Sequence, residues 1–462
     1  MLGIQLQRHH EVSLARQIYQ ALREQMTEGR LHPGEILPST RELAKQLAVS
    51  RNTVCEAYDM LLAEGFIESR QGSSTRVADG LQLGKKEKVV DKLDMISPVP
   101  ANIRADFRTG RPDLRRFPTH TWLQLLRKNA EQMPLEQWGY TGPAGLPQLR
   151  EEIAAWLFRS KGMVVSPQDI FITAGATQAL HLLADLLFSE GQGIMVEDPC
   201  HMGMLKVLQS RRFKIHPVPV DEQGLQTDYL ADHYDCGIYI TPSHQYPLGG
   251  ILSAARRVDL VRFVRKYDQY IIEDDYDSEF RYSGPPVSPL QALDPQRVIY
   301  VGTFSKILFP ALRIGYVVLP ERLQSRWRHL RTHADVQNPP FEQEALAEYL
   351  KTRKLDRHVQ QMRKLYGQRR QILLETMTEV FGGIWRPWGD AAGLHLAVQF
   401  PGMSFTDDFA RQAREHEIYI TPVEYHSIRK GAHLDKLLLG YGHLEAKEIQ
   451  AGIHLLKDLI LV

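Results

Sequence analysis

One segment of this chain carries a lysine between hydroxyl residues and an arginine, and these residue types together are suited to covalent chemistry on a bound ligand. Lys306 follows Thr303 and Ser305 and stands seven residues before Arg313. A desolvated lysine amine forms a Schiff base with a carbonyl group, and two hydroxyls with a guanidinium suit a phosphate. The segment therefore predicts a pyridoxal phosphate (PLP) site, although a lysine near an arginine is more often a solvated surface charge.

Two other segments supply groups that such a site needs. Residues 271–272 predict a buried strand that ends in carboxylates, where ligands bind in open parallel sheets. Asp274 could there hold a pyridine nitrogen protonated, and Tyr276 could reach the phenolic oxygen of the ring. Residues 171–173 predict a strand, and the small residues 174–178 open a helix whose N-terminus favours phosphate. Taken singly, each segment also fits a purely structural role.

The composition is that of an ordinary globular protein. The chain has 462 residues, of which 43% are hydrophobic and 24% charged, and this length allows two or three domains. No apolar run approaches the roughly 18 residues of a membrane span, and the first residues lack the apolar core of a signal peptide. We therefore expect a cytoplasmic protein. Cys55, Cys200 and Cys236 are widely spaced and odd in number, which indicates neither a disulfide framework nor a metal site.

Residues 1–78 carry three helix patterns. Apolar residues at a spacing of four predict a helix over 14–26. Ser39 opens a short second helix with a capping box, and Ser50 caps a third helix over 51–64. Two short strands with a polar turn between them follow and predict a β-hairpin.

This order of elements predicts a winged helix-turn-helix whose third helix enters the major groove of DNA. Arg51 and Asn52 suit base edges, and Ser50 and Thr53 suit phosphates. The segment holds nine Lys and Arg against nine Asp and Glu, so DNA binding would depend on a local patch. A three-helix protein-interaction module is the alternative. The residues expected at DNA are Ser39, Arg41, Ser50, Arg51, Asn52, Thr53, Arg70 and Gly72.

The same segment resembles the DNA-binding domain of the GntR family. The matching stretches are 37–44, 49–54 and 64–67. Cys55 and the serines at 73–74 stand where that family commonly has basic residues, which removes potential phosphate contacts.

The rest of the chain divides into a connector and a large domain. Residues 79–105 contain a charge cluster and a Ser-Pro-Val-Pro run, and we interpret them as a linker. Over 106–462 helical and strand patterns alternate, as in an α/β domain with a mostly parallel sheet.

Residues 106–462 are similar to fold type I aminotransferases along nearly their full length. The matching stretches are 139–146, 173–178, 197–199, 241–249, 273–276 and 305–306. The resemblance implies an α/β domain with a mixed, mostly parallel sheet and a Schiff base at Lys306. It also implies cofactor contacts from Gly175, Ala176, Thr177, His201, Tyr246, Asp274, Tyr276, Thr303, Ser305 and Arg313.

A GntR-type winged helix joined to an aminotransferase-like domain looks like a MocR-type transcription regulator. The resemblance implies a homodimer with exchanged domains that binds double-stranded operator DNA. It would sense a small amine, an amino acid or PLP itself through an aldimine at Lys306. A working aminotransferase with a vestigial DNA-binding domain is the alternative, and a PLP scaffold that binds DNA constitutively is a third interpretation.

Three positions depart from working aminotransferases. Leu438 stands where these enzymes carry the arginine that clamps the substrate carboxylate, Tyr246 replaces an asparagine, and His201 replaces a stacking tyrosine. Loss of the clamp would misplace an amino acid, which alone costs about a hundredfold in rate. We expect Arg429, in the preceding loop, to contact the effector instead; the alternative is an effector that is not an ordinary amino acid. Whether the domain retains enzyme activity stays open at this point.

Overall fold

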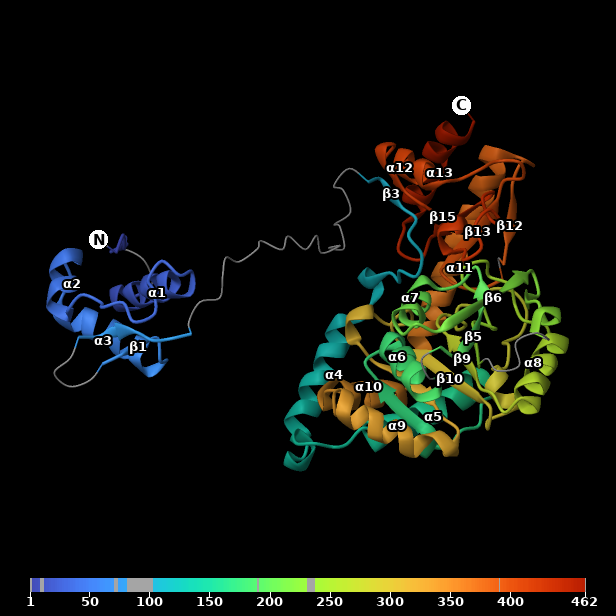
Figure 1. The fold of residues 1–462 in the computed structure, drawn as a ribbon. Helices are drawn as coiled ribbons and strands as arrows, with labels where there is room; N and C mark the ends of the chain where they lie inside the picture. Colours follow the sequence, from blue (N-terminus) through green and yellow to red (C-terminus); the bar gives the residue numbers. More distant parts are fainter. Residues whose placement is uncertain are drawn as a thin grey trace. The chain divides into compact units, whose positions relative to one another are not determined.

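The computed structural model describes most of the chain, in two compact units. The described residues are 2–8, 12–69, 74–80, 103–188, 191–230, 237–389 and 391–461. The units are Met1–Pro98 and Val99–Val462, and each is described by itself (Figure 1). Within the described ranges, every helix is too short or too polar to cross a membrane.

The small unit has the predicted winged helix-turn-helix fold. Its elements are α1 (Leu14–Thr27), α2 (Thr40–Leu47), α3 (Arg51–Ala63) and the antiparallel strands β1 (Ile67–Glu68) and β2 (Arg76–Val77). Ser13, Ser39 and Ser50 each accept a hydrogen bond from a backbone N–H three residues later, so the predicted helix starts are confirmed. Ile18, Val54 and similar apolar side chains of all three helices form one buried core.

The end of the small unit is described only in part. The predicted wing residues Arg70 and Gly72 lie outside the described residues, as does 81–102 of the predicted linker. Ala105, at the end of that predicted linker, already pairs in β3 (Ala105–Asp106) with β14 (Ile418–Tyr419). The domain boundaries stay a prediction.

A mixed, mostly parallel sheet of eight strands forms the centre of the large unit, as predicted. In spatial order the strands are β4 (Ile170–Thr173), β11 (Gly315–Val318), β10 (Val298–Thr303), β9 (Ile271–Asp275), β8 (Gly237–Ile240), β5 (Gly193–Asp198), β6 (Lys214–Asp221) and β7 (Gly224–Leu225). The five neighbours from β10 to β6 pair in parallel. The strands β4, β11 and β7 pair antiparallel with their neighbours.

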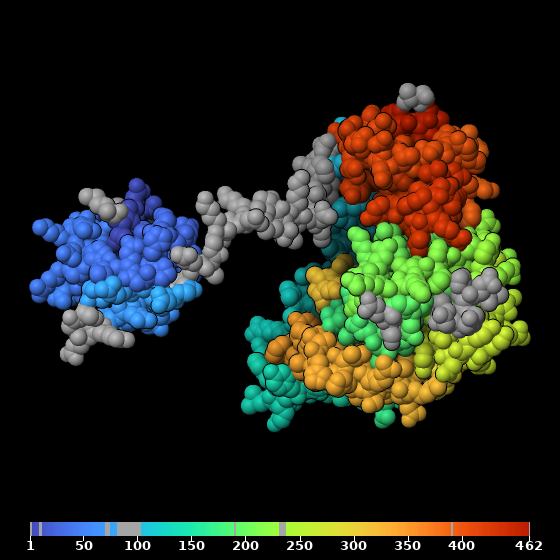
Figure 2. All heavy atoms as spheres, in the orientation of Figure 1, coloured from blue at the N-terminus to red at the C-terminus, as the bar shows by residue number. Residues whose placement is uncertain are grey.

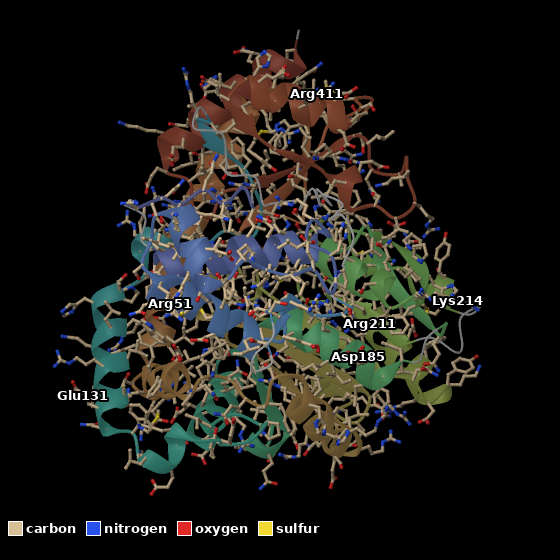
Figure 3. All side chains as sticks on the ribbon, turned by 60° about the vertical axis from the view of Figure 1, so that its left-hand side comes forward. Arg51, Glu131, Asp185, Arg211, Lys214 and Arg411 are labelled. Carbon is tan, nitrogen blue, oxygen red and sulfur yellow. The ribbon has the colours of Figure 1, made fainter. Side chains whose placement is uncertain are left out.

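Helices cover both faces of this sheet (Figure 1). One face packs on α6 (Ala176–Leu187), α7 (Met202–Ser210) and α9 (Glu321–Ala334). The other packs on α4 (Thr119–Gln132), α5 (Pro147–Lys161), α8 (Ala254–Lys266), α10 (Pro340–Lys351) and α11 (Lys354–Phe381). Arg211 at the end of α7 is paired with Asp185 of α6, Nη2 to Oδ2 2.9 Å (Figure 3). The strands are apolar on both faces, as a doubly covered sheet requires.

The C-terminal part forms a second, antiparallel sheet with its own helices. Its elements are β12 (Arg386–Trp388), β13 (His395–Gln399), β16 (Lys436–Gly440), β15 (Thr421–Pro422), α12 (Asp407–Glu415) and α13 (Ala446–Ile460). Ala397 and Leu438 of this sheet share one apolar cluster with Leu248 and Leu260 of the central domain. Figure 2 shows this part, orange to red, seated on the green residues. The contact places the C-terminal sheet beside one end of the central strands.

Candidate functional site

The carboxyl ends of the central strands meet around one cavity of about 250 Å³. Parallel strands end at the same edge of a sheet, so segments far apart in the sequence come together there. The lining residues are Thr109, Gly110, Ala176, Thr177, Leu180, His201, Tyr239, Thr241, Tyr246, Asp274, Tyr276, Thr303, Ser305, Lys306, Pro310 and Arg313.

Every residue predicted to bind the cofactor lines this cavity except Gly175, which lies against it. Gly175 has a φ of +86° at the start of α6, and a Cβ there would come within 3.1 Å of Arg313 Nη2. A side chain at this position would therefore be strained and would push the guanidinium away. The structure thus brings together the three segments that the sequence singled out.

Lys306 is half-buried in the cavity wall. Its Nζ donates a hydrogen bond to the carbonyl of Gly110 at 2.7 Å, and a Cβ on Gly110, whose φ is +69°, would lie 2.8 Å from this nitrogen. Burial lowers the pKa of Lys306, while Asp277 and Asp274 act in the opposite direction. The uncharged amine, which is the nucleophilic form, is therefore favoured.

Asp274, the second-last residue of β9, has one carboxylate oxygen with a hydrogen-bond partner and one without. Tyr239 donates its hydroxyl to Oδ2 at 2.8 Å. Oδ1 is buried and has no hydrogen-bond partner among the described residues. Burial raises the pKa of Asp274 to about 6. The open oxygen in the cavity fits a protonated ring nitrogen, which would be a charge-assisted donor.

The opposite end of the cavity suits a phosphate. The N-terminus of α6 supplies Ala176 and Thr177 there, with free backbone N–H groups and the positive end of the helix dipole. Thr303 donates to Ser305, Oγ1 to Oγ 3.0 Å, and Arg313 Nη2 donates to the carbonyl of residue 174 at 2.5 Å. Hydroxyls, backbone donors and a guanidinium are the groups that bind phosphate.

Aromatic rings form the third side of the cavity. The Tyr246 hydroxyl pairs with Thr109 Oγ1 at 2.9 Å, and its ring centroid lies 5.4 Å from that of His201. The Tyr276 hydroxyl is 2.9 Å from His244 Nδ1. The contact predicted for Tyr276 with a ring oxygen therefore stays a prediction, since its hydroxyl already has a partner.

Three imidazoles surround Tyr246, and two of them, His395 and His426, are buried, whereas His201 is exposed. Burial lowers the pKa of His395 to about 4 and that of His426 to about 3. The ring centroids of His395 and His426 lie 5.4 and 5.1 Å from the Tyr246 centroid. These two imidazoles offer hydrogen-bonding groups without a positive charge at neutral pH.

The predicted effector residue Arg429 does not line the cavity. Its Nε lies 3.2 Å from Asp198 Oδ2, and its Nη2 donates to the carbonyl of Pro217 at 2.9 Å. Leu438 is fully buried in an apolar cluster with Ala397 and also stays away from the cavity. The effector role of Arg429 remains a prediction, because its guanidinium contacts Asp198 and Pro217 and does not reach the cavity lining.

In the small unit, those residues predicted to contact DNA that the structure describes lie at the N-termini of α2 and α3. Arg41, Arg51 and Asn52 are exposed, and Arg51 is labelled in Figure 3. Ser39 and Ser50 cap α2 and α3, and the Ser50 hydroxyl also pairs with that of Thr53. Arg51 Nε donates to Thr40 Oγ1 at 3.4 Å, so the N-termini of α2 and α3 are adjacent.

The sequence did not single out several lining residues, and Tyr239 is the most informative of them. It sits in β8 opposite Ile272 of β9, so it shares a face with Asp274 two residues further on. The available signal in the sequence was a tyrosine within a buried strand. This signal could be used only once the order of the strands was known, because that order places β8 beside the strand that carries Asp274. The others are Thr109, Gly110, Leu180, Thr241 and Pro310.

Comparison with known proteins matches both units. Residues 110–433 match the family "Aminotransferase class I and II", and residues 14–77 match "Bacterial regulatory proteins, gntR family". The chain is 32% identical to the probable rhizopine catabolism regulatory protein MocR of Rhizobium meliloti, over 99% of this chain and 95% of that one. It is 36% identical to the HTH-type pyridoxine biosynthesis transcriptional regulator PdxR of Corynebacterium glutamicum, over 86% and 85%.

A solved structure matches the large unit. This is the kynurenine aminotransferase of Pyrococcus horikoshii in complex with PMP, with a TM-score of 0.72 and 26% identity over 78% of this chain and 91% of that one. The fold of the large unit is therefore that of the aminotransferases.

Proposed function

Since this chain belongs to the MocR-type transcription regulators of the GntR family, which carry an aminotransferase class I and II domain, we propose that it senses a small amine through PLP at Lys306. The observation that carries the proposal is the single cavity in which Lys306, Asp274 and Arg313 lie together. They are partners for the carbonyl, the ring nitrogen and the phosphate of this cofactor. The signal would pass to operator DNA, so the protein would act in the cytoplasm.

Five residues would hold the phosphate group. Ala176 and Thr177 offer backbone N–H groups at the start of α6, Thr303 and Ser305 offer hydroxyls, and Arg313 offers a guanidinium. Three of these come from the loop that also carries Lys306, so the phosphate would fix the cofactor close to its covalent partner.

The remaining residues would control the reactive part of the cofactor. When bound, PLP supplies a carbonyl that amines attack and a ring that withdraws electrons. Asp274 Oδ1 would accept a hydrogen bond from the ring nitrogen, because this oxygen is buried and has no other partner among the described residues. Burial lowers the pKa of Lys306, which makes the uncharged, nucleophilic form of its amine more accessible than in a free lysine. The buried Tyr246 ring would exclude water from one side.

Occupancy of the cavity would select between arrangements of the two units. A small amine, an amino acid or PLP itself would change what Lys306 binds. An effector shifts such an equilibrium only by its different affinities for the two arrangements. The regulator therefore needs no catalytic turnover.

The regulator interpretation is favoured over a working aminotransferase. The chain matches named transcription regulators over nearly its full length, and the position of the carboxylate clamp holds Leu438 in an apolar cluster. Without a clamp, an amino acid would be poorly oriented for proton removal.

We propose that the protein acts as a homodimer with exchanged domains. Leu135, Trp138 and Tyr140 expose 81%, 58% and 87% of their surface. Large apolar side chains gathered over six residues support a protein–protein contact. Operator half-sites would then match the two-fold symmetry of the dimer.

Absorption spectra of the PLP-loaded protein test the sensing proposal. A panel of amines and amino acids is added with and without a keto acid, and the visible band of the lysine-bound cofactor is followed. We expect a spectral change that persists without turnover. Loss of the band that a keto acid restores would instead establish an enzyme, and the absence of any lysine-bound cofactor would refute the proposal.

Substitution of Arg51 tests the DNA interface. Arg51→Ala should weaken operator binding by about 1–3 kcal/mol if the guanidinium contacts a base in two places. Arg30→Ala is the matched control, because Arg30 is paired with Glu28 after α1, and it should bind normally. Gel shifts at constant salt measure both, and equal affinities of Arg51→Ala and wild type would exclude the base contact.

A further inference from the structure

A buried pair of side chains lies directly behind the Tyr276 hydroxyl. His244 comes after β8 and Asp277 comes after β9, and His244 Nδ1 is 2.8 Å from Asp277 Oδ1. The two side chains expose only 1% and 2% of their surface. The Tyr276 hydroxyl is 2.9 Å from the same nitrogen, His244 Nδ1. One ring nitrogen therefore faces two oxygen atoms, and the position of the hydrogen between them decides what Tyr276 can donate to.

The carboxylate fixes a hydrogen on the imidazole. Asp277 acts on Lys306 as a negative charge, and a carboxylate only accepts hydrogen bonds, so its bond to His244 needs a hydrogen on Nδ1. This holds whether or not the other ring nitrogen is protonated. Nδ1 then has no lone pair to which the Tyr276 hydroxyl could donate. Tyr276 can only accept from this N–H, and its own hydrogen stays free.

The free hydrogen belongs to a side chain that lines the candidate cavity. Tyr276 is one of the lining residues, and within the described part of the chain its hydroxyl has no partner other than His244. Burial and then the charge of Asp277 raise the pKa of Tyr276 well above its ordinary value, so the hydroxyl keeps its hydrogen at neutral pH. The cavity wall thus contains a donor that no described acceptor of the protein uses.

The C-terminal sheet holds the pair in this orientation. Asp277 Oδ2 accepts the backbone N–H of Leu394, just before β13, at 3.3 Å. A Cβ on Gly393, whose φ is +86°, would lie 2.7 Å from the same oxygen and would run into the His244 ring. The centroid of the His395 ring lies 5.2 Å from that of His244, and burial lowers the pKa of His395 to about 4. This close packing leaves the His244 ring little room to rotate.

We propose that Asp277 is a positioning residue, which through His244 directs the hydrogen of Tyr276 into the cavity, where the phenolic oxygen of PLP accepts it. The inference rests on the proposed function, because the acceptor belongs to the cofactor. A hydrogen bond to that oxygen stabilises it as an anion, which lowers the pH at which the lysine-bound cofactor loses its proton. Without the carboxylate, Tyr276 donates to His244 and the cofactor loses this interaction.

Asp277→Asn should reverse the hydrogen bond at His244. The N–H of Leu394 keeps the amide oxygen at the position of Oδ2, so the amide NH₂ group faces His244 Nδ1 and donates to it. Nδ1 then carries no hydrogen and accepts from Tyr276. An asparagine in place of the aspartate beside the catalytic histidine of serine proteases produces the wrong tautomer in the same way.

The pH dependence of the visible absorption band of PLP-loaded full-length protein tests the proposal. The midpoint is measured in wild type, Tyr276→Phe, Asp277→Asn and the double variant. Tyr276→Phe should raise it by about one to two pH units, the size of one hydrogen bond to a charged group. Asp277→Asn also removes a negative charge near Lys306, which lowers the midpoint. This charge effect is the same with and without Tyr276→Phe and cancels when the two steps are compared.

The comparison of the two steps decides the role of Asp277. Made in wild type, Asp277→Asn should move the midpoint upward by at least about one pH unit relative to the same change made in Tyr276→Phe. Equal effects in the two backgrounds would mean that Asp277 acts by charge or packing alone, and the inference is wrong. Asp277→Ala, which also removes the acceptor, gives the same comparison if the amide is not tolerated.

Two further variants serve as controls. Asp294 is also buried, and its Oδ2 is 2.6 Å from Arg265 Nε, but it does not line the cavity, so Asp294→Asn should keep the wild-type midpoint. His244→Phe added to Asp277→Asn removes the competing acceptor and should return the midpoint toward that of wild type. If the midpoint stays raised, His244 does not carry the effect and the inference is wrong. A failure of PLP to attach to the wild-type protein is seen before any titration and refutes the proposed function instead.

Discussion

Two lysines near the carboxyl end of β9, the buried Lys161 and the half-buried Lys306, have opposite environments. Lys161 Nζ lies 2.8 Å from Asp275 Oδ2 and 2.9 Å from Glu279 Oε1. Although burial alone lowers the pKa of Lys161, these two carboxylates raise it well above its ordinary value. Lys306 donates only to a backbone carbonyl, and burial lowers its pKa. The first lysine is held as a cation, whereas the charged form of the second is disfavoured relative to a free lysine.

The two adjacent aspartates differ in the same way. Asp275 accepts hydrogen bonds from Lys161, Ser278 and Tyr300. Burial opposes ionisation of Asp275, but Lys161 prevails and lowers its pKa. Asp274 accepts one hydrogen bond and keeps one buried oxygen open. Consecutive strand residues point to opposite faces of the sheet, so one face carries a satisfied ion network and the other an unsatisfied site.

The difference separates structural from functional groups of the same type. A buried charge without partners costs free energy, and a fold retains it where a ligand completes the interaction. The paired face should therefore determine stability, and the open face should determine binding.

The substitution Lys306→Ala should show the largest difference between the roles of the two lysines. The variant should lose all covalently bound PLP, because no other described residue offers an amine in the cavity lining. Its free energy of unfolding should change by less than about 1 kcal/mol, since a half-buried amine without an ion pair contributes little. Borohydride reduction and mass spectrometry measure the adduct. Lys206→Ala, on the exposed side of α7, should keep it, and an adduct in Lys306→Ala would contradict the assignment.

Lys161→Met should show the reverse behaviour. Loss of this amine leaves Asp275 and Glu279 as buried carboxylates without a counter-charge, so the free energy of unfolding should fall by about 3–5 kcal/mol. Lys128→Met is the control, because Lys128 is 52% exposed in its pair with Glu348 and such pairs contribute about 1 kcal/mol or less. Urea unfolding measures both variants. Similar losses in the two would mean that the buried pair has no special role.

Local signals in the sequence predicted a large part of the fold. The serines before α1, α2 and α3 set the helix starts because an N-cap needs only neighbours in the chain. The strand and turn that lead into α6 were predicted for the same reason. The order of the eight strands and the antiparallel direction of β11 depend on contacts between distant segments, which no short pattern specifies.

The residues of the candidate site differ in the same way: those in local motifs were predictable from the sequence, and those placed by distant contacts were not. Lys306, Asp274 and Arg313 stand in recognisable motifs, and the structure brings them to one cavity. Gly110 had no motif, since its position against the Lys306 amine depends on how distant segments pack together. Arg429 was favoured because it precedes the missing clamp in sequence, but its guanidinium is bound by Asp198.

The pH dependence of the free energy of unfolding tests the difference between the two aspartates. The expected effect is smaller than that of the lysine substitutions. In the cofactor-free protein Asp274 has a pKa of about 6 against an ordinary value of 3.8. Between about pH 4 and pH 6 the folded state therefore binds more protons than the unfolded state, and the free energy of unfolding falls as pH rises. The whole decrease is at most about 3 kcal/mol, from roughly 1.4 kcal/mol for each pH unit.

Asp274→Asn should remove this decrease, because an amide does not titrate. Asp275→Asn is the matched comparison with the opposite sign. The pKa of Asp275 is lowered in the fold, so its contribution to stability is present above the ordinary carboxyl pKa and is lost as pH falls below it. Urea unfolding between about pH 4 and pH 7 measures wild type and both variants. A constant difference between wild type and Asp274→Asn over this range would mean that Asp274 is ionised throughout and that the open face is as well satisfied as the paired one.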